Sequence, residues 1–115
     1  MHKYKILIAA IVLATLSGCS SISKGGYYWG DYSTSYYDYL KNPTEEQLIS
    51  RIESLEEIIV KSGELDLRTP PAVHAELGQA YMKQGLVEKA KEHFRSEVSL
   101  YPESELFVRR LVSDL

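Results

Sequence analysis

The 115-residue sequence has one cysteine, three histidines and no apolar run long enough for a membrane-spanning helix. A single cysteine excludes an internal disulfide framework. The histidines stand apart from one another in sequence, and no HExxH or CxxC spacing predicts a metal site. No Gly-rich phosphate loop follows a strand, and no serine has the sequence context of a nucleophile elbow. We therefore expect a protein that is not an enzyme and that holds no metal or cofactor.

Residues 1–18 have the features of a signal peptide. Lys3 and Lys5 form a short basic region, and residues 6–16 form an apolar run of eleven residues. Because a bilayer-spanning helix needs about 20 residues, the run suits the hydrophobic region of a signal peptide instead. The alternatives are an uncleaved anchor and an ordinary secretory signal with an incidental cysteine.

The stretch Leu16-Ser17-Gly18-Cys19 resembles the lipobox of bacterial lipoproteins. Small residues at its two middle positions let a peptidase approach the backbone, and only the thiol can become a thioether. The resemblance implies lipidation of Cys19, cleavage before it and N-acylation with a fatty acid such as palmitate. Several acyl chains on one residue form a durable anchor. Because Ser20 rather than Asp follows the cysteine, similarity to lipoprotein sorting implies the outer membrane, on its periplasmic face.

The expected mature chain, residues 19–115, is acidic. Loss of Lys3 and Lys5 leaves 11 basic residues against 16 acidic ones, a formal charge of −5. This charge argues against nucleic acid as a partner and against docking on anionic headgroups beyond the lipid anchor itself. Residues 19–26 are expected to be the lipidated Cys19 and a flexible tether, residues 20–26, that reaches at most about 25 Å. We therefore expect the domain to stay close to its membrane.

The rest of the chain predicts helices and no strands, so we expect an all-α fold of about four helices. Thr44 and Gln47 form a capping-box pattern, and apolar residues then recur at helical spacing. Gly85 marks a turn, Pro102 marks a helix exit, and Ser104 is the expected N-cap of the last helix. The predicted helices cover residues 44–62, 71–84, 87–100 and 104–115.

Within this helical domain, residues 43–115, the segment 71–104 resembles a tetratricopeptide repeat of 34 residues. Small residues stand where its two helices cross, and aromatic residues fill the space around the crossing. His74 departs from the pattern at the usual Trp position, and Glu97 departs where a small residue is usual. One repeat cannot bury its own apolar face, so a flanking segment or a partner must complete it. The alternative is a generic helical hairpin. The matching residues are Leu77, Gly78, Tyr81, Ala90, Phe94 and Pro102.

The resemblance implies that a peptide or protein surface binds the concave face, which the first helix of the repeat lines. Of the outward positions, Gln79, Met82 and Lys83 are candidate partner-binding residues, and the alternative is plain solvated surface. His74 is interpreted as a packing residue in the Trp position rather than as a catalytic base. The outward positions of the register are Ala72, Ala75, Gln79, Met82 and Lys83.

The segment 27–42 is unusually rich in aromatic residues. Between Tyr27 and Tyr39, six of thirteen residues are Tyr and one is Trp. Three interpretations of these rings are open. They pack on the helices of the same domain as a cap, they bind a partner protein, or they stack on sugars of peptidoglycan or lipopolysaccharide. Ser33 and Thr34 are candidate N-caps for a short helix here. The candidate partner-binding residues are Tyr27, Tyr28, Trp29, Tyr32, Tyr36 and Tyr37.

Taken together, the lipobox, the stretch YYWGDYSTSYYDYLKNPTEEQL and the tetratricopeptide-like second half resemble domain of unknown function 4810, a family of small bacterial lipoproteins. The resemblance implies an outer-membrane complex with a curli-transport-type (CsgG-like) lipoprotein and another small lipoprotein. We therefore expect a protein–protein adaptor or assembly factor in the cell envelope, with no small-molecule substrate. The alternative is a peptidoglycan- or glycan-binding lipoprotein that uses the aromatic segment.

Overall fold

The computed structural model of the chain describes residues 26–113, which form helices and no strands. The predicted all-α fold is confirmed, with five α-helices where about four were expected. Each helix within residues 26–113 is too short or too polar to span a bilayer. The predicted signal peptide, Cys19 and the tether as far as residue 25 lie outside the described residues. The elements are α2 (Tyr32–Lys41), α3 (Glu45–Glu64), α4 (Val73–Lys83), α5 (Val87–Leu100), the 3₁₀ turn Pro102–Ser104 and α6 (Glu105–Ser113).

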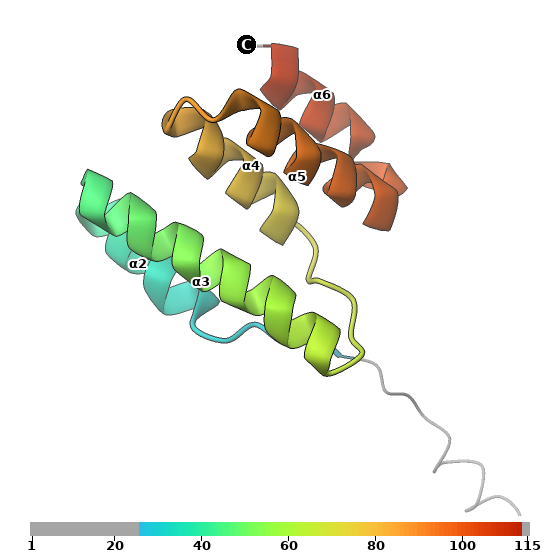
Figure 1. The fold of residues 1–115 in the computed structure, drawn as a ribbon, viewed down its shortest axis with the longest axis horizontal. Coiled ribbons are helices and arrows are strands. Elements are labelled where there is room, and N and C mark those ends of the chain that lie inside the picture. Colours follow the sequence, from blue (N-terminus) through green and yellow to red (C-terminus); the bar gives the residue numbers. More distant parts are fainter. Residues whose placement is uncertain (1–25, 114–115) are drawn as a thin grey trace, which may run out of the picture.

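The helices pack in chain order as a stack of antiparallel pairs (Figure 1). α3 packs against both α2 and α4, and α5 packs against both α4 and α6. The α2–α3 pair therefore lies at one end of the stack and α6 at the other. The apolar core runs between these layers and is formed by Leu48, Ile52, Leu55, Ile58, Val73, Leu77, Ala80, Tyr81, Ala90, Phe94 and Val108.

Helix α3 begins as the sequence predicts and ends later. The Thr44 hydroxyl accepts a hydrogen bond from the Gln47 backbone N–H at 3.2 Å, which is the predicted cap. The predicted end at residue 62 is wrong, because Gly63 keeps the helical conformation and the helix continues to Glu64. The chain turns away at Asp66, whose φ of 55° lies in the left-handed region. A glycine in the last turn therefore does not by itself end this helix.

Helix α4 begins two residues later than predicted, at Val73, and its N-terminus is capped from another helix. Ala72 precedes it with a left-handed φ of 76° and has no side-chain cap of its own. The buried Glu97 carboxylate on α5 accepts hydrogen bonds from the backbone N–H groups of Ala72 at 2.8 Å and Ala75 at 3.4 Å. Glu97 departs from the repeat pattern because here the position supplies a helix cap.

The α4–α5 hairpin is closely packed where the sequence predicts a crossing. Gly85 forms the turn with a φ of 77°, which favours glycine. A Cβ on Gly78 would lie 2.6 Å from a ring carbon of Phe94, so no larger residue fits without displacement of that ring. Ala90 of α5 is fully buried. The hairpin has the predicted contacts, while its assignment to the tetratricopeptide family stays a prediction.

Helix α6 packs one of its faces against α5, and the opposite face of α6 is exposed. Ser104, the predicted N-cap, instead ends a 3₁₀ turn, and the α-helix starts at Glu105. Val108 is buried against the core, whereas Leu106 and Phe107 are more than half exposed. The apolar residues of this helix therefore outnumber those that its contact with α5 buries.

Candidate binding groove

The aromatic segment forms a true helix, α2, whose rings point both inward and outward. The helix begins at Tyr32, so the predicted caps Ser33 and Thr34 lie within its first turn, and Asp31 precedes it without a side-chain cap bond. Tyr32 is half-buried against the core, while Tyr37 is 62% exposed. The segment therefore closes one side of its own domain and also presents rings to solvent.

A buried arginine on α3 fixes α2 in place. Arg51 is 4% exposed, and its guanidinium donates to the backbone carbonyl of Tyr32 at 2.8 Å and to the Ser35 hydroxyl at 2.7 Å. The same guanidinium forms an ion pair with Glu76 of α4 at 2.9 Å. It also lies over the rings of Tyr32 and Tyr36, at 4.4 and 5.2 Å from their centroids. One side chain thus connects three helices.

Further hydrogen bonds complete this cluster. The Tyr32 hydroxyl donates to Glu76 at 2.7 Å, and burial together with this carboxylate raises the pKa of Tyr32 to about 12. The Ser35 hydroxyl lies 3.0 Å from that of Ser54, which in turn donates to Asp31. Among the described residues, no buried side-chain nitrogen or oxygen lacks a hydrogen-bond partner. Buried charge is tolerated where every buried polar group has a hydrogen-bond partner, and this cluster meets that condition.

The rings before α2 form a chain of edge contacts that leads to it. Tyr27 meets Trp29 at 6.2 Å between centroids, and Trp29 meets Tyr32 at 4.9 Å, both in T-shaped geometry. The Tyr28 hydroxyl donates to Glu57 of α3 at 3.1 Å. Tyr27 and Trp29 remain about 40% exposed. These residues are therefore anchored to the domain and still accessible.

A groove of about 240 Å³ lies between α2 and α4, with α3 contributing to its lining. A shallower hollow adjoins it toward the α2–α3 turn and shares the residues Tyr39, Leu48 and Lys83. The Lys83 ammonium donates to the Tyr39 hydroxyl at 2.9 Å, across the groove from α4 to α2. The groove combines aromatic and aliphatic walls with the Arg51–Glu76 pair and a lysine. Its lining residues are Tyr36, Tyr39, Leu40, Leu48, Arg51, Glu76, Gln79, Ala80 and Lys83.

The groove gathers some of the predicted partner-binding residues and not others. Tyr36 of the aromatic segment lines the same groove as Gln79 and Lys83 of α4, although more than 40 residues separate them in sequence. Met82 packs against the core cluster instead of lining the groove. Ala75 is 1% exposed, so the prediction that it faces outward is wrong. The helix face turned toward the groove is therefore narrower than the repeat register implies.

The residues that organise the groove, Arg51 and Glu76, were not among the predicted site residues. A usable signal was present, because Arg51 lies one position before Ile52 and four before Leu55, on the face of α3 that the apolar stripe defines. A charged residue on such a face needs a buried partner. The identity of that partner depends on the packing of α3 against α4, which the sequence pattern does not specify.

The two histidines of the described chain, expected to stand alone, lie together between α4 and α5. The Nδ1 atoms of His74 and His93 are 3.0 Å apart, so one neutral ring donates to the other. Burial, followed by repulsion from His93, lowers the pKa of His74 to about 4, and burial lowers the pKa of His93. The Tyr81 ring stacks on His93, and its hydroxyl donates to Glu56 at 2.6 Å. No group of three or more potential ligands for a metal occurs in residues 26–113, and the pair packs as a buried contact.

Comparison with known proteins identifies a family but no characterised relative. The chain matches the family model described as domain of unknown function, DUF4810, over residues 27–111. No curated protein and no solved structure matches the chain. The matched range begins at Tyr27, the first residue of the aromatic segment, and includes helices α2 to α5 in full. The chain therefore belongs to the DUF4810 family.

Proposed function

We propose that this protein is a non-enzymatic, lipid-anchored outer-membrane lipoprotein that binds another envelope protein in the groove between α2 and α4. The observation that carries the proposal is the Arg51 cluster, which holds α2 and α4 at a fixed separation. A groove that is already formed loses little conformational entropy when a ligand enters it. Exposed tyrosine on a rigid helix is the kind of side chain that dominates the binding energy of protein interfaces.

The chemistry of the groove suits a segment of protein chain. Tyr36 and Leu40 offer apolar contact area, while Gln79 and Lys83 offer hydrogen-bond donors at the opposite wall. Gln79 carries both a donor and an acceptor, so it can pair with a peptide backbone. A partner with an apolar side chain and an acidic group would use both walls. The tetratricopeptide-like register of residues 71–104 supports the same use, since that family binds peptides on the face lined by the first helix of each pair.

Co-purification of tagged full-length chain from detergent-solubilised membranes tests the proposal. Tyr36→Ala and Lys83→Ala change exposed groove residues and should each reduce the recovered partner at least about tenfold, a loss of about 1.4 kcal/mol. Leu65→Ala, which removes a similarly exposed side chain outside the groove, is the matched control. Partner recovery that stays the same in both groove variants contradicts the proposal.

The glycan-binding alternative predicts a different result in the same experiment. Trp29 and Tyr37 are exposed and could stack on sugar rings. If the chain is retained on purified peptidoglycan, if Trp29→Ala abolishes that retention, and if no protein co-purifies, the protein-binding proposal is wrong and the glycan interpretation replaces it.

A further inference from the structure

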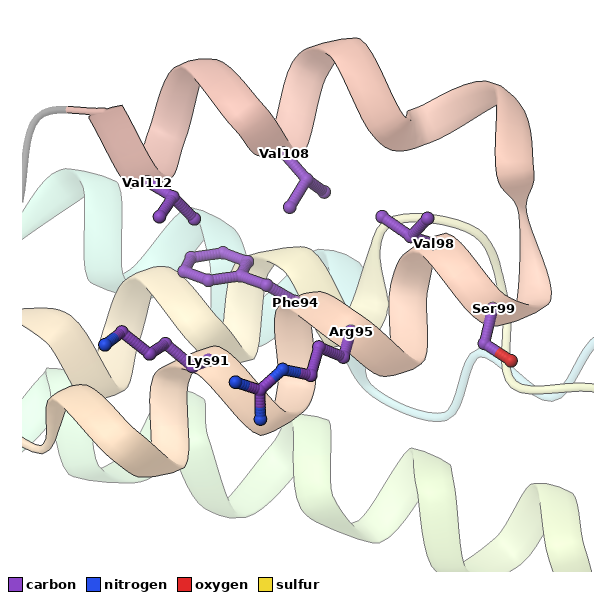
Figure 2. A pocket seen from close by; sticks show the side chains of 7 residues that line it. All are labelled: Lys91, Phe94, Arg95, Val98, Ser99, Val108 and Val112. Carbon is purple, nitrogen blue, oxygen red and sulfur yellow. The ribbon is translucent and has the colours of Figure 1, made fainter.

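A second, apolar groove lies between α5 and α6, away from the α2–α4 groove. It has a volume of about 600 Å³. Figure 2 shows Val108 and Val112 of α6 pointing toward Phe94 of α5, with Val98 beside them and Lys91 and Arg95 along α5. The walls are thus apolar, and the side chains along the α5 edge are basic. Lys91 also makes an exposed contact with Glu88 at 3.4 Å. Leu106 and Phe107 of α6 are exposed as well, outside the lining of this groove.

The opposite end of the stack carries the complementary charge. Helix α3 contains six glutamates and two basic residues, of which Arg51 is buried. Its face away from the core carries exposed Ile49 and Val60. Glutamates lie beside these two apolar residues on the same face, because positions three, four and seven apart coincide on a helix. The exposed residues of this face are Glu46, Ile49, Glu53, Glu57, Val60 and Glu64.

We propose that the α5–α6 groove binds the outer face of α3 from a second copy of the chain, so that copies associate head to tail. Ile49 and Val60 would enter the apolar groove, and the glutamates beside them would meet Lys91 and Arg95. Helical stacks whose ends are polar stop growing, whereas exposed apolar residues at both ends favour continuation of the stack. Because the two surfaces differ, the contact is heterologous and builds chains or rings. It uses neither Tyr36 nor Lys83, so it stands independently of the α2–α4 groove.

Crosslinking of two differently tagged full-length copies in cells tests this contact and its polarity. One copy carries Ser99→Cys at the edge of the groove and the other carries Ile49→Cys, and a bismaleimide with a flexible spacer bridges them. No cysteine occurs between residue 20 and the C-terminus, and the unsubstituted chain under the same treatment controls for Cys19. We expect an adduct in the mixture and none when either variant is expressed alone. An adduct from Ser99→Cys alone would indicate that two identical grooves face each other, which overturns the proposal, as does the absence of any adduct.

A charge exchange separates specific contact from random collision. Arg95→Glu in the Ser99→Cys copy should lower the yield of mixed adduct about tenfold, because it places like charges opposite each other. Glu53→Arg in the Ile49→Cys copy should restore most of that yield. Arg109→Glu, on the exposed surface of α6 and outside the groove lining, is the control and should leave the yield unchanged. A yield that Arg95→Glu leaves unchanged overturns the proposal.

Discussion

Replacement of Arg51 with alanine should destabilise the protein more than any substitution of an exposed charge. The guanidinium makes three polar contacts, with Tyr32, Ser35 and Glu76, at 2.7–2.9 Å. Removal of one partner of a buried ion pair typically costs 3–5 kcal/mol, because the remaining charge loses its compensation. Glu76 keeps part of its solvation, since its side chain is 25% exposed. We therefore expect a loss at the lower end of this range, about 3 kcal/mol.

Urea denaturation followed by far-ultraviolet circular dichroism measures this loss. For a domain of this size, about 3 kcal/mol corresponds to a fall in Tm of about 12–24 °C. The matched control is Arg109→Ala, whose ion pair with Glu105 has 71% and 60% exposed side chains and should contribute under about 0.5 kcal/mol. The double variant Arg51→Met, Glu76→Gln removes both charges and should recover part of the loss. If Arg51→Ala costs less than about 1 kcal/mol, the buried cluster does not hold α2 as described.

Three further substitutions or conditions test the packing of α4 on α5. Gly78→Ala should cost about 1–3 kcal/mol by overpacking, because its Cβ would approach the Phe94 ring to 2.6 Å, and urea denaturation measures it. Glu97→Ala should cost about 2 kcal/mol through loss of the α4 cap, with reduced helicity in circular dichroism as an additional sign. Acidification should also destabilise the fold. The pKa of His74 is lowered to about 4 from an unfolded value near 6.5, so the unfolded state binds more protons between these values and stability falls as pH drops through this window. The loss should reach about 1–2 kcal/mol after solvent screening, and His74→Phe should flatten a Tm profile measured between pH 7 and 4. A profile with the same slope in His74→Phe would assign the pH dependence to other groups.

The sequence predicted the helical architecture well because helix signals are local. Thr44 with Gln47 located the start of α3 to the residue, and the helix at 87–100 was predicted with its observed bounds. The close crossing of Gly78 and Phe94 also followed from the residue pattern. In each case, the prediction depended on residues near one another in the chain or on a recurrent packing motif.

Apart from the end of α3, which lies two residues later than predicted, the misses occurred where distant residues decide the outcome. Glu97 caps α4 from 22 and 25 residues away, so no local pattern could reveal why a charged residue is buried there. The two histidines lie in neighbouring helices and meet only after α4 packs on α5. Arg51 was recognisable as a charge on an apolar face, but its pairing with Glu76 required knowledge of the tertiary contact. The candidate groove was therefore predictable in its residue types and not in its position.

We propose that α2 is a fixed part of the domain and that its outer side, at the groove, binds an envelope protein. Photo-crosslinking in cells from a benzoylphenylalanine at Tyr36, with the same probe at Leu65 as control, tests it most directly. Tyr36 lines the groove, whereas Leu65 is exposed after the end of α3. We expect a discrete protein adduct from position 36 that is absent from position 65. The absence of an adduct at position 36, or an identical set of adducts from both positions, would contradict it.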